Sequence, residues 1–97
     1  GDELALGRYT LKCLHVPGHS PGSIVFYSPE ARCLFAGDVL FQGSIGRSDL
    51  PGGDIRTLID GIREKLLTLP DATLVYPGHG DATTIGYEKQ YNFYLKF

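Results

Sequence analysis

The sequence predicts a mixed α/β (α+β) protein with a mixed sheet of about four strands and two helices. Short segments rich in β-branched and aromatic residues alternate with turns that contain glycine and proline, a pattern typical of strands. A longer segment has apolar residues at intervals of three and four, and a second such pattern lies near the C-terminus, which is typical of helices. With 97 residues, the chain is expected to form one domain at most.

Four segments are predicted to be strands: Arg8–Val16, Ser23–Ser28, Cys33–Asp38 and Ala72–Tyr76. Short connections join the first three, so neighbours among them run antiparallel. A helix connects the third strand to the fourth, and such a crossover makes these two strands parallel. The first, third and fourth strands should therefore end at the same edge of the sheet.

The first helix is predicted over Asp54–Leu69, with Asp54 as its N-cap and Pro70 just after its end. Its apolar residues are expected to share one face: Ile55, Leu58, Ile59, Ile62 and Leu66. The second helix is predicted to begin near Thr84 and to continue to the C-terminus, with one face formed by Tyr87, Tyr91, Tyr94 and Leu95. A long loop, Val39–Gly53, precedes the first helix, and loops of this length are usually functional or disordered.

Charge and composition exclude several classes of partner. The net charge is −2 and no basic stripe is present, so neither a nucleic acid nor an anionic membrane surface is expected to bind. No apolar run approaches the roughly 20 residues of a membrane span, and the N-terminal residues show no export signal. Two cysteines allow a disulfide by count, but the strands that carry Cys13 and Cys33 are separated by a third strand. Their Cα atoms should lie about 10 Å apart, beyond the roughly 7 Å limit for a disulfide, so free thiols are favoured. Free thiols predict a cytoplasmic protein.

Three residues of ligand type should meet at one edge of the sheet. His19 and His79 each follow a Pro-Gly dipeptide just beyond a strand, and Asp38 ends the third strand. Two imidazoles and a carboxylate suit zinc, or else iron or manganese. Asp38 has two oxygens, so it either joins one shared ion or bridges two ions roughly 3.5–4 Å apart. A lone histidine in a turn is more often solvated, so the prediction depends on the convergence of all three.

Four motifs in one order carry a family resemblance: "HVPGHSPGS", "LFAGDVLF", "GRSDLPGGD" and "VYPGHG". Together they resemble the metallo-β-lactamase superfamily of hydrolases, and within it the bacterial glyoxalase II-type (hydroxyacylglutathione hydrolase-like) thioesterases. The resemblance implies that His19 binds the first metal of a dinuclear zinc centre and that His79 binds the second. Asp38 would bridge both metals and take part in catalysis. Gly46, Arg47 and Asp49 match a loop signature of this subgroup.

The resemblance also implies that the N-terminal half of the family's fold is missing from this chain. The family's first metal-binding motif, His-x-His-x-Asp-His, is absent from the sequence. The chain therefore resembles the C-terminal half of an αββα sandwich, a single partial domain over residues 1–97. The face of its sheet that would pack on the missing N-terminal half is predicted to be bare and apolar. Such a face favours a homodimer or higher oligomer.

The implied activity is hydrolysis of a small-molecule thioester by hydroxide that a metal generates. Arg47 is expected either to attract an anionic group of the substrate or to form an ion pair with Asp49. Because ligands are missing, we expect weak metal occupancy and negligible activity in the chain alone. Two alternatives remain open: a persulfide dioxygenase with a single iron on the same fold, and a non-catalytic binding or oligomerisation module.

Overall fold

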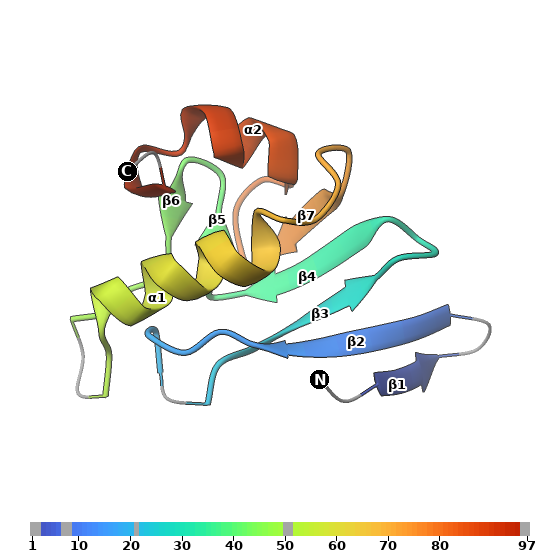
Figure 1. Ribbon diagram of the computed structural model, residues 1–97, viewed down its shortest axis with the longest axis horizontal. Helices are drawn as coiled ribbons and strands as arrows, with labels where there is room; N and C mark the ends of the chain where they lie inside the picture. The colour runs from blue at the N-terminus through green and yellow to red at the C-terminus, as the bar shows by residue number, and fades with distance from the viewer. Residues whose placement is uncertain (1–2, 7–8, 21, 50–51, 96–97) are drawn as a thin grey trace.

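A six-stranded mixed sheet dominates the computed structural model, which describes residues 3–6, 9–20, 22–49 and 52–95 (Figure 1). The strands of this sheet, in spatial order, are β1 (Glu3–Leu6), β2 (Tyr9–His15), β3 (Ile24–Ser28), β4 (Cys33–Gly37), β7 (Leu74–Pro77) and β8 (Thr83–Thr84). A separate two-stranded sheet pairs β5 (Leu40–Phe41) with β6 (Ser44–Ile45). The helical segments are α1 (Ile55–Gly61), η1 (Ile62–Leu66), α2 (Ile85–Tyr91) and η2 (Phe93–Leu95).

The predicted strand directions are confirmed. β2, β3 and β4 pair antiparallel in that order, and β4 pairs parallel to β7 across the helical crossover. β2, β4 and β7 therefore all run toward the same edge of the sheet. The register between β4 and β7 shifts between Phe35 and Gly37, so the regular pairing is interrupted, as at a bulge, immediately before Asp38. A bulge bends its strand and re-aims the residues that follow it.

The first predicted helix is divided into two types of turn. Asp54 caps α1 as predicted, because its side chain accepts a hydrogen bond from the backbone N–H of Thr57 at 3.1 Å. The helix then continues in η1 as a π-helical turn. Three residues spaced by four, Leu58, Ile62 and Leu66, are fully buried. An α-helix has about 3.6 residues per turn, so side chains spaced by four shift progressively around the helix axis. A π-helical turn is wider and shifts them in the opposite direction. The same residues therefore stay against the sheet, whereas Ile55 of the predicted face is half exposed.

The C-terminal helix is shorter than predicted and buries a different face. Thr84 caps α2 through its hydroxyl, but the helix ends at Tyr91 and resumes as the 3₁₀ turn η2. Of the predicted face only Leu95 is buried, and Tyr87, Tyr91 and Tyr94 are exposed. The buried side consists instead of Ile85, Glu88, Asn92 and Leu95. The predicted face was wrong because it followed hydropathy alone, and two of the buried residues are polar.

Other short elements were not predicted. The loop Val39–Gly53 contains the β5–β6 hairpin, and strands β1 and β8 extend the sheet at its two edges. Parts of the predicted segments lie outside the described residues: Arg8 of the first strand, Leu50 and Pro51 of the long loop, and Lys96 and Phe97 of the last helix. The predicted class, a mixed sheet with two helices, is confirmed.

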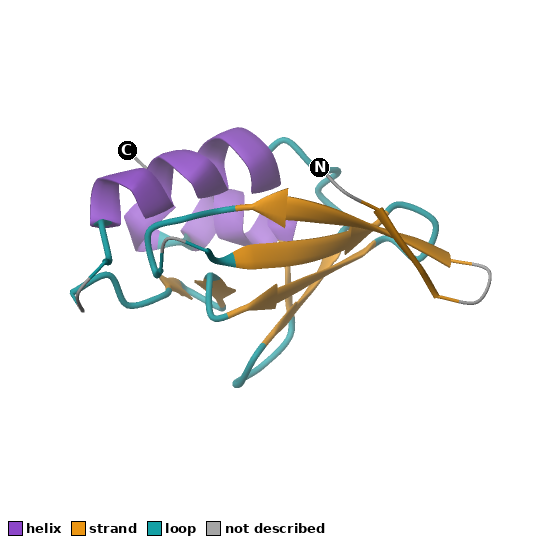
Figure 2. Ribbon diagram, turned by 90° about the horizontal axis from the view of Figure 1, so that it is seen from below, coloured by secondary structure: helices purple, strands orange, loops and turns teal. Residues whose placement is uncertain are grey.

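The helices gather on one side of the sheet, where a single core forms between them and the strands (Figure 2). The side chains that alternate onto the other side include Ile24, Phe35, Leu74 and Tyr76, all 41–51% exposed. This second face is apolar, as predicted. Both cysteines are free thiols, as predicted, and burial raises the pKa of Cys33. No helix in the described part of the chain is long and apolar enough to cross a membrane.

Candidate metal centre

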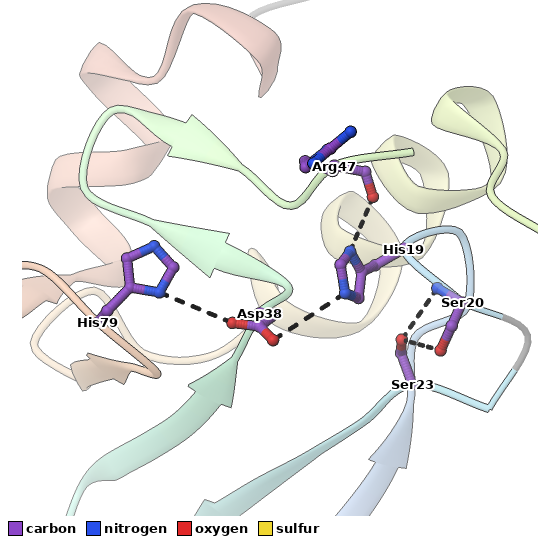
Figure 3. A network of polar contacts seen from close by, with 6 residues as sticks. All are labelled: His19, Ser20, Ser23, Asp38, Arg47 and His79. Atoms are coloured by element: carbon purple, nitrogen blue, oxygen red, sulfur yellow. Dashed lines mark hydrogen bonds and ion pairs between the residues drawn. The ribbon is translucent and has the colours of Figure 1, made fainter. Parts of the chain in front are cut away.

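The three predicted ligands are brought together by the ends of β2, β4 and β7 (Figure 3). Asp38 lies between the two imidazoles and faces each of them with a different oxygen. His19 Nε2 lies 4.0 Å from Oδ2 of Asp38, and His79 Nδ1 lies 3.8 Å from Oδ1. These side chains stand at the surface: His19 is 27% exposed, Asp38 58% and His79 77%. A small molecule can therefore reach all three.

The orientation of His19 is fixed by a backbone carbonyl. Its Nδ1 donates a hydrogen bond to the carbonyl oxygen of Arg47 at 2.8 Å. Because a carbonyl only accepts, the neutral ring must carry its proton on Nδ1. The lone pair of Nε2 then faces Asp38, which is the orientation a metal ligand needs. Two serines shape the turn that follows His19, since Ser23 Oγ accepts from the backbone N–H of Ser20 at 3.1 Å.

The glycines of the two Pro-Gly dipeptides are needed for different structural reasons. At Gly18 the backbone φ is +130°, and an added Cβ would lie 2.5 Å from the backbone nitrogen of Leu58 in α1. Glycine at this position lets the His19 loop lie directly against the helix. At Gly78 an added Cβ would lie 3.1 Å from Oδ1 of Asp38. The second glycine therefore leaves space for the carboxylate itself.

The β5–β6 hairpin contributes residues to the site that the sequence did not indicate. A cavity of about 560 Å³ opens over the candidate ligands, lined by His19, Asp38, Phe41, Gln42, Ser44, Ile45, Arg47, His79, Gly80 and Asp81. The ring of Phe41 packs on the imidazole of His79, with centroids 4.7 Å apart. Phe41 follows Asp38 closely in sequence, but a two-residue strand has no periodicity from which this contact could be inferred.

Arg47 forms the predicted ion pair and also lines the cavity. Its guanidinium donates two hydrogen bonds to Asp49, at 3.1 and 3.2 Å. These hydrogen bonds and the charge of Arg47 lower the pKa of Asp49. Both side chains are largely exposed, so the pair is screened by solvent and contributes little to stability.

The donor set suits a metal but supplies only part of a coordination shell. Catalytic zinc usually has three protein ligands and an open position. Within residues 3–6, 9–20, 22–49 and 52–95, no group of three or more His, Cys, Asp or Glu side chains is arranged to hold a metal ion. The two histidines lie on opposite sides of Asp38, which favours a bridging carboxylate over one ion held by all three residues.

A sequence profile of the metallo-beta-lactamase superfamily matches residues 1–79. Hydroxyacylglutathione hydrolase GloC of Haemophilus influenzae is 52% identical over 95 residues, which cover 98% of this chain and 45% of that protein. The probable metallo-hydrolase YqgX of Bacillus subtilis is 52% identical over 93 residues, which cover 96% of this chain and 44% of that protein. The chain thus spans about half the length of the curated relatives it matches.

Solved structures agree with the sequence relatives. The BLEG-1 B3 metallo-beta-lactamase superposes with a TM-score of 0.94 at 48% identity, covering 100% of this chain and 46% of that chain. ETHE1 from Myxococcus xanthus superposes with a TM-score of 0.89 at 38% identity, and the match covers 96% of this chain and 42% of that chain. TTHA1623 in a di-iron-bound form superposes with a TM-score of 0.85 at 48% identity, and the match covers 95% of this chain and 45% of that chain. The profile match over most of the chain and this shared fold show that the chain belongs to the metallo-β-lactamase superfamily.

Proposed function

We propose that this chain carries one half of the active site of a metal-dependent thioester hydrolase of the hydroxyacylglutathione type. The observation that carries the proposal is the placement of His19 and His79 on opposite oxygens of Asp38, in the wall of an open cavity. A relative named hydroxyacylglutathione hydrolase, 52% identical over nearly the whole chain, supports the substrate class.

Each residue of the site has a role in this proposal. His19 and His79 would each hold one metal ion, and Asp38 would contribute a carboxylate oxygen to both. Zinc is the proposed metal, although the family also includes a di-iron-bound structure. Bound metal ions would supply hydroxide at neutral pH, because they lower the pKa of water to about 7. Arg47, which lines the cavity, is the proposed residue that attracts an anionic group of the substrate.

The three residues would provide each ion with only one imidazole and one carboxylate oxygen. A catalytic zinc usually requires more protein ligands than that. We therefore propose that a second half-domain supplies the remaining ligands and packs on the apolar face of the sheet. The chain alone is expected to bind metal weakly and to have negligible thioesterase activity.

A comparison of two proteins tests this function. The full-length gene product that contains this chain should hydrolyse a hydroxyacylglutathione thioester, whereas the purified 97-residue chain should not. Chelation of the metal and the substitution His79→Ala should each abolish activity of the longer protein. Chelator-sensitive turnover by the chain alone would contradict the half-site proposal, and a full-length protein inactive on thioesters would contradict the substrate class.

The same experiment distinguishes the alternatives. One iron per protein, with oxygen uptake in the presence of a persulfide, would indicate a persulfide dioxygenase instead. A full-length protein that binds no metal would indicate a non-catalytic binding or oligomerisation module.

A further inference from the structure

Glu88 is a fully buried carboxylate in α2 that takes no part in the proposed chemistry. It accepts three hydrogen bonds from three different segments. Oε1 accepts from the backbone N–H of Gly43 at 3.0 Å and from Asn92 Nδ2 at 2.8 Å. Oε2 accepts from the Thr83 hydroxyl at 2.6 Å. A buried carboxylate is costly unless it is hydrogen-bonded, so these three donors account for its presence in the core.

Two of the three segments lead directly to the candidate metal centre. Gly43 is in the turn of the β5–β6 hairpin, and Thr83 begins β8, shortly after the His79 loop. Asn92 reinforces the first of these links, because its Nδ2 also donates to the carbonyl oxygen of Ser44 at 3.1 Å. Glu88 thus joins the hairpin and the strand that follows His79 to one helix.

The hairpin and the residues just after it contact all three candidate ligands. Phe41 packs on the ring of His79, and the carbonyl oxygen of Arg47 accepts from Nδ1 of His19. Gly46 lies so close to Asp38 that an added Cβ would be 2.0 Å from its carbonyl oxygen. A change in the position of the hairpin therefore changes the surroundings of His19, Asp38 and His79 together.

We propose that Glu88 is a positioning residue of the metal centre: by holding the β5–β6 hairpin and the start of β8, it fixes the orientation of both imidazoles. The proposal rests on the proposed function insofar as the imidazoles bind metal. Groups that hydrogen-bond a metal ligand directly typically change metal affinity by roughly 10–100-fold when they are removed. Glu88 acts through the hairpin and β8, so its effect should lie at the lower end of this range or below it.

The first measurement needs no metal. Long-range ¹H–¹⁵N spectra of the histidine rings at mildly alkaline pH report which nitrogen carries the proton. In the unaltered chain we expect His19 to be protonated on Nδ1. Glu88→Ala should reduce the population of that tautomer, whereas His15, which does not line the cavity, should be unchanged. An unchanged His19 tautomer in a folded variant would overturn the proposal, as would an equal change at His15.

The second measurement is zinc affinity, determined by competition with a chromophoric chelator. Glu88→Ala should weaken zinc binding by up to roughly 10-fold, the lower end of the effect of removing a direct hydrogen-bond partner of a ligand. Glu88→Gln keeps the shape and one carbonyl acceptor, so its loss should be smaller; if Glu88→Ala does not fold, Glu88→Gln decides. Glu64→Gln removes an exposed carboxylate from η1 and should bind zinc as the unaltered chain does.

The two measurements separate the two claims. If the unaltered chain and the full-length protein bind no zinc, the proposed function fails, and the His19 tautomer still decides the role of Glu88. If zinc binds equally to the unaltered chain and to the folded Glu88 variants, the positioning role is wrong while the metal centre stands. Circular dichroism and thermal unfolding of each variant show that the comparison is between folded proteins.

Discussion

Asp38 is the residue that the two proposed metal positions share. Each of its oxygens faces one imidazole, so a change at Asp38 affects both metal positions, whereas a change at His79 affects one. We predict that Asp38→Asn weakens zinc binding more than His79→Ala does, and by more than the roughly 10–100-fold cost of losing an outer partner.

Zinc stoichiometry and competition titrations check this order. Asp60→Asn is the matched control, because Asp60 is an exposed carboxylate in α1. Retention of zinc by Asp38→Asn at the level of Asp60→Asn would contradict the bridging role.

The ion pair between Arg47 and Asp49 should have a measurable effect on the pKa of the Asp49 carboxyl group. Hydrogen bonds from Arg47 lower the pKa of Asp49 below its usual range, with smaller contributions from its own backbone and from the charge of Arg47. A pKa that folding lowers stabilises the folded state above the unfolded pKa, and this contribution is lost as pH falls through the folded pKa. We predict that Arg47→Ala raises the pKa of Asp49, as followed by the carboxyl ¹³C shift. An unchanged Asp49 titration in Arg47→Ala would show that Arg47 is not the cause of the lowered pKa.

At the scale of elements, the contact between the His19 loop and α1 should be intolerant of any side chain. Gly18 has φ +130°, and an added Cβ would lie within 2.6 Å of three Leu58 atoms. We predict that Gly18→Ala lowers the free energy of unfolding by about 2 kcal/mol or more, because strain and overpacking add.

Gly22→Ala provides the control in the same loop. An added Cβ at Gly22 meets nothing within 4 Å, and its φ is not in the left-handed region. Denaturant unfolding of the two variants gives the comparison, and equal stabilities would show that the loop moves away from the helix at little cost.

The sequence predicted those elements that carry a long periodic signal. β2, β3, β4 and β7 and the first helix are present near their predicted bounds, and their directions place His19, Asp38 and His79 together. The β5–β6 hairpin was missed because two-residue strands have no period. The π-helical turn was missed because it depends on packing against the sheet, which hydropathy does not report.

The buried face of α2 was predicted wrongly for a different reason. Hydropathy grouped Tyr87, Tyr91 and Tyr94 with Leu95 on one face, whereas in the structure the three tyrosines are exposed and Glu88 is buried. A buried glutamate is stable here only because Gly43, Thr83 and Asn92 donate to it. Those partners are set by the tertiary fold, so no local pattern in the sequence could indicate them.

At the scale of the whole molecule, the two faces of the sheet differ in what covers them. The helices cover one face, and apolar side chains on the other face remain exposed. On this second face Phe35 and Tyr76 stack with ring centroids 5.7 Å apart, so the exposed aromatic surface is continuous across β4 and β7. A continuous apolar patch of this kind marks an association site.

For the chain on its own we predict self-association through this face, as a homodimer or higher oligomer. Phe35 is 43% exposed at the centre of the patch, so Phe35→Lys places a charge where apolar surface would otherwise be buried and should weaken association. Phe93→Lys changes an aromatic residue in η2 that is 67% exposed, and it should leave association unchanged. Sedimentation equilibrium over a range of concentrations measures both. A monomeric chain at high concentration would contradict self-association, and equal effects of the two substitutions would show that the chains associate through another surface.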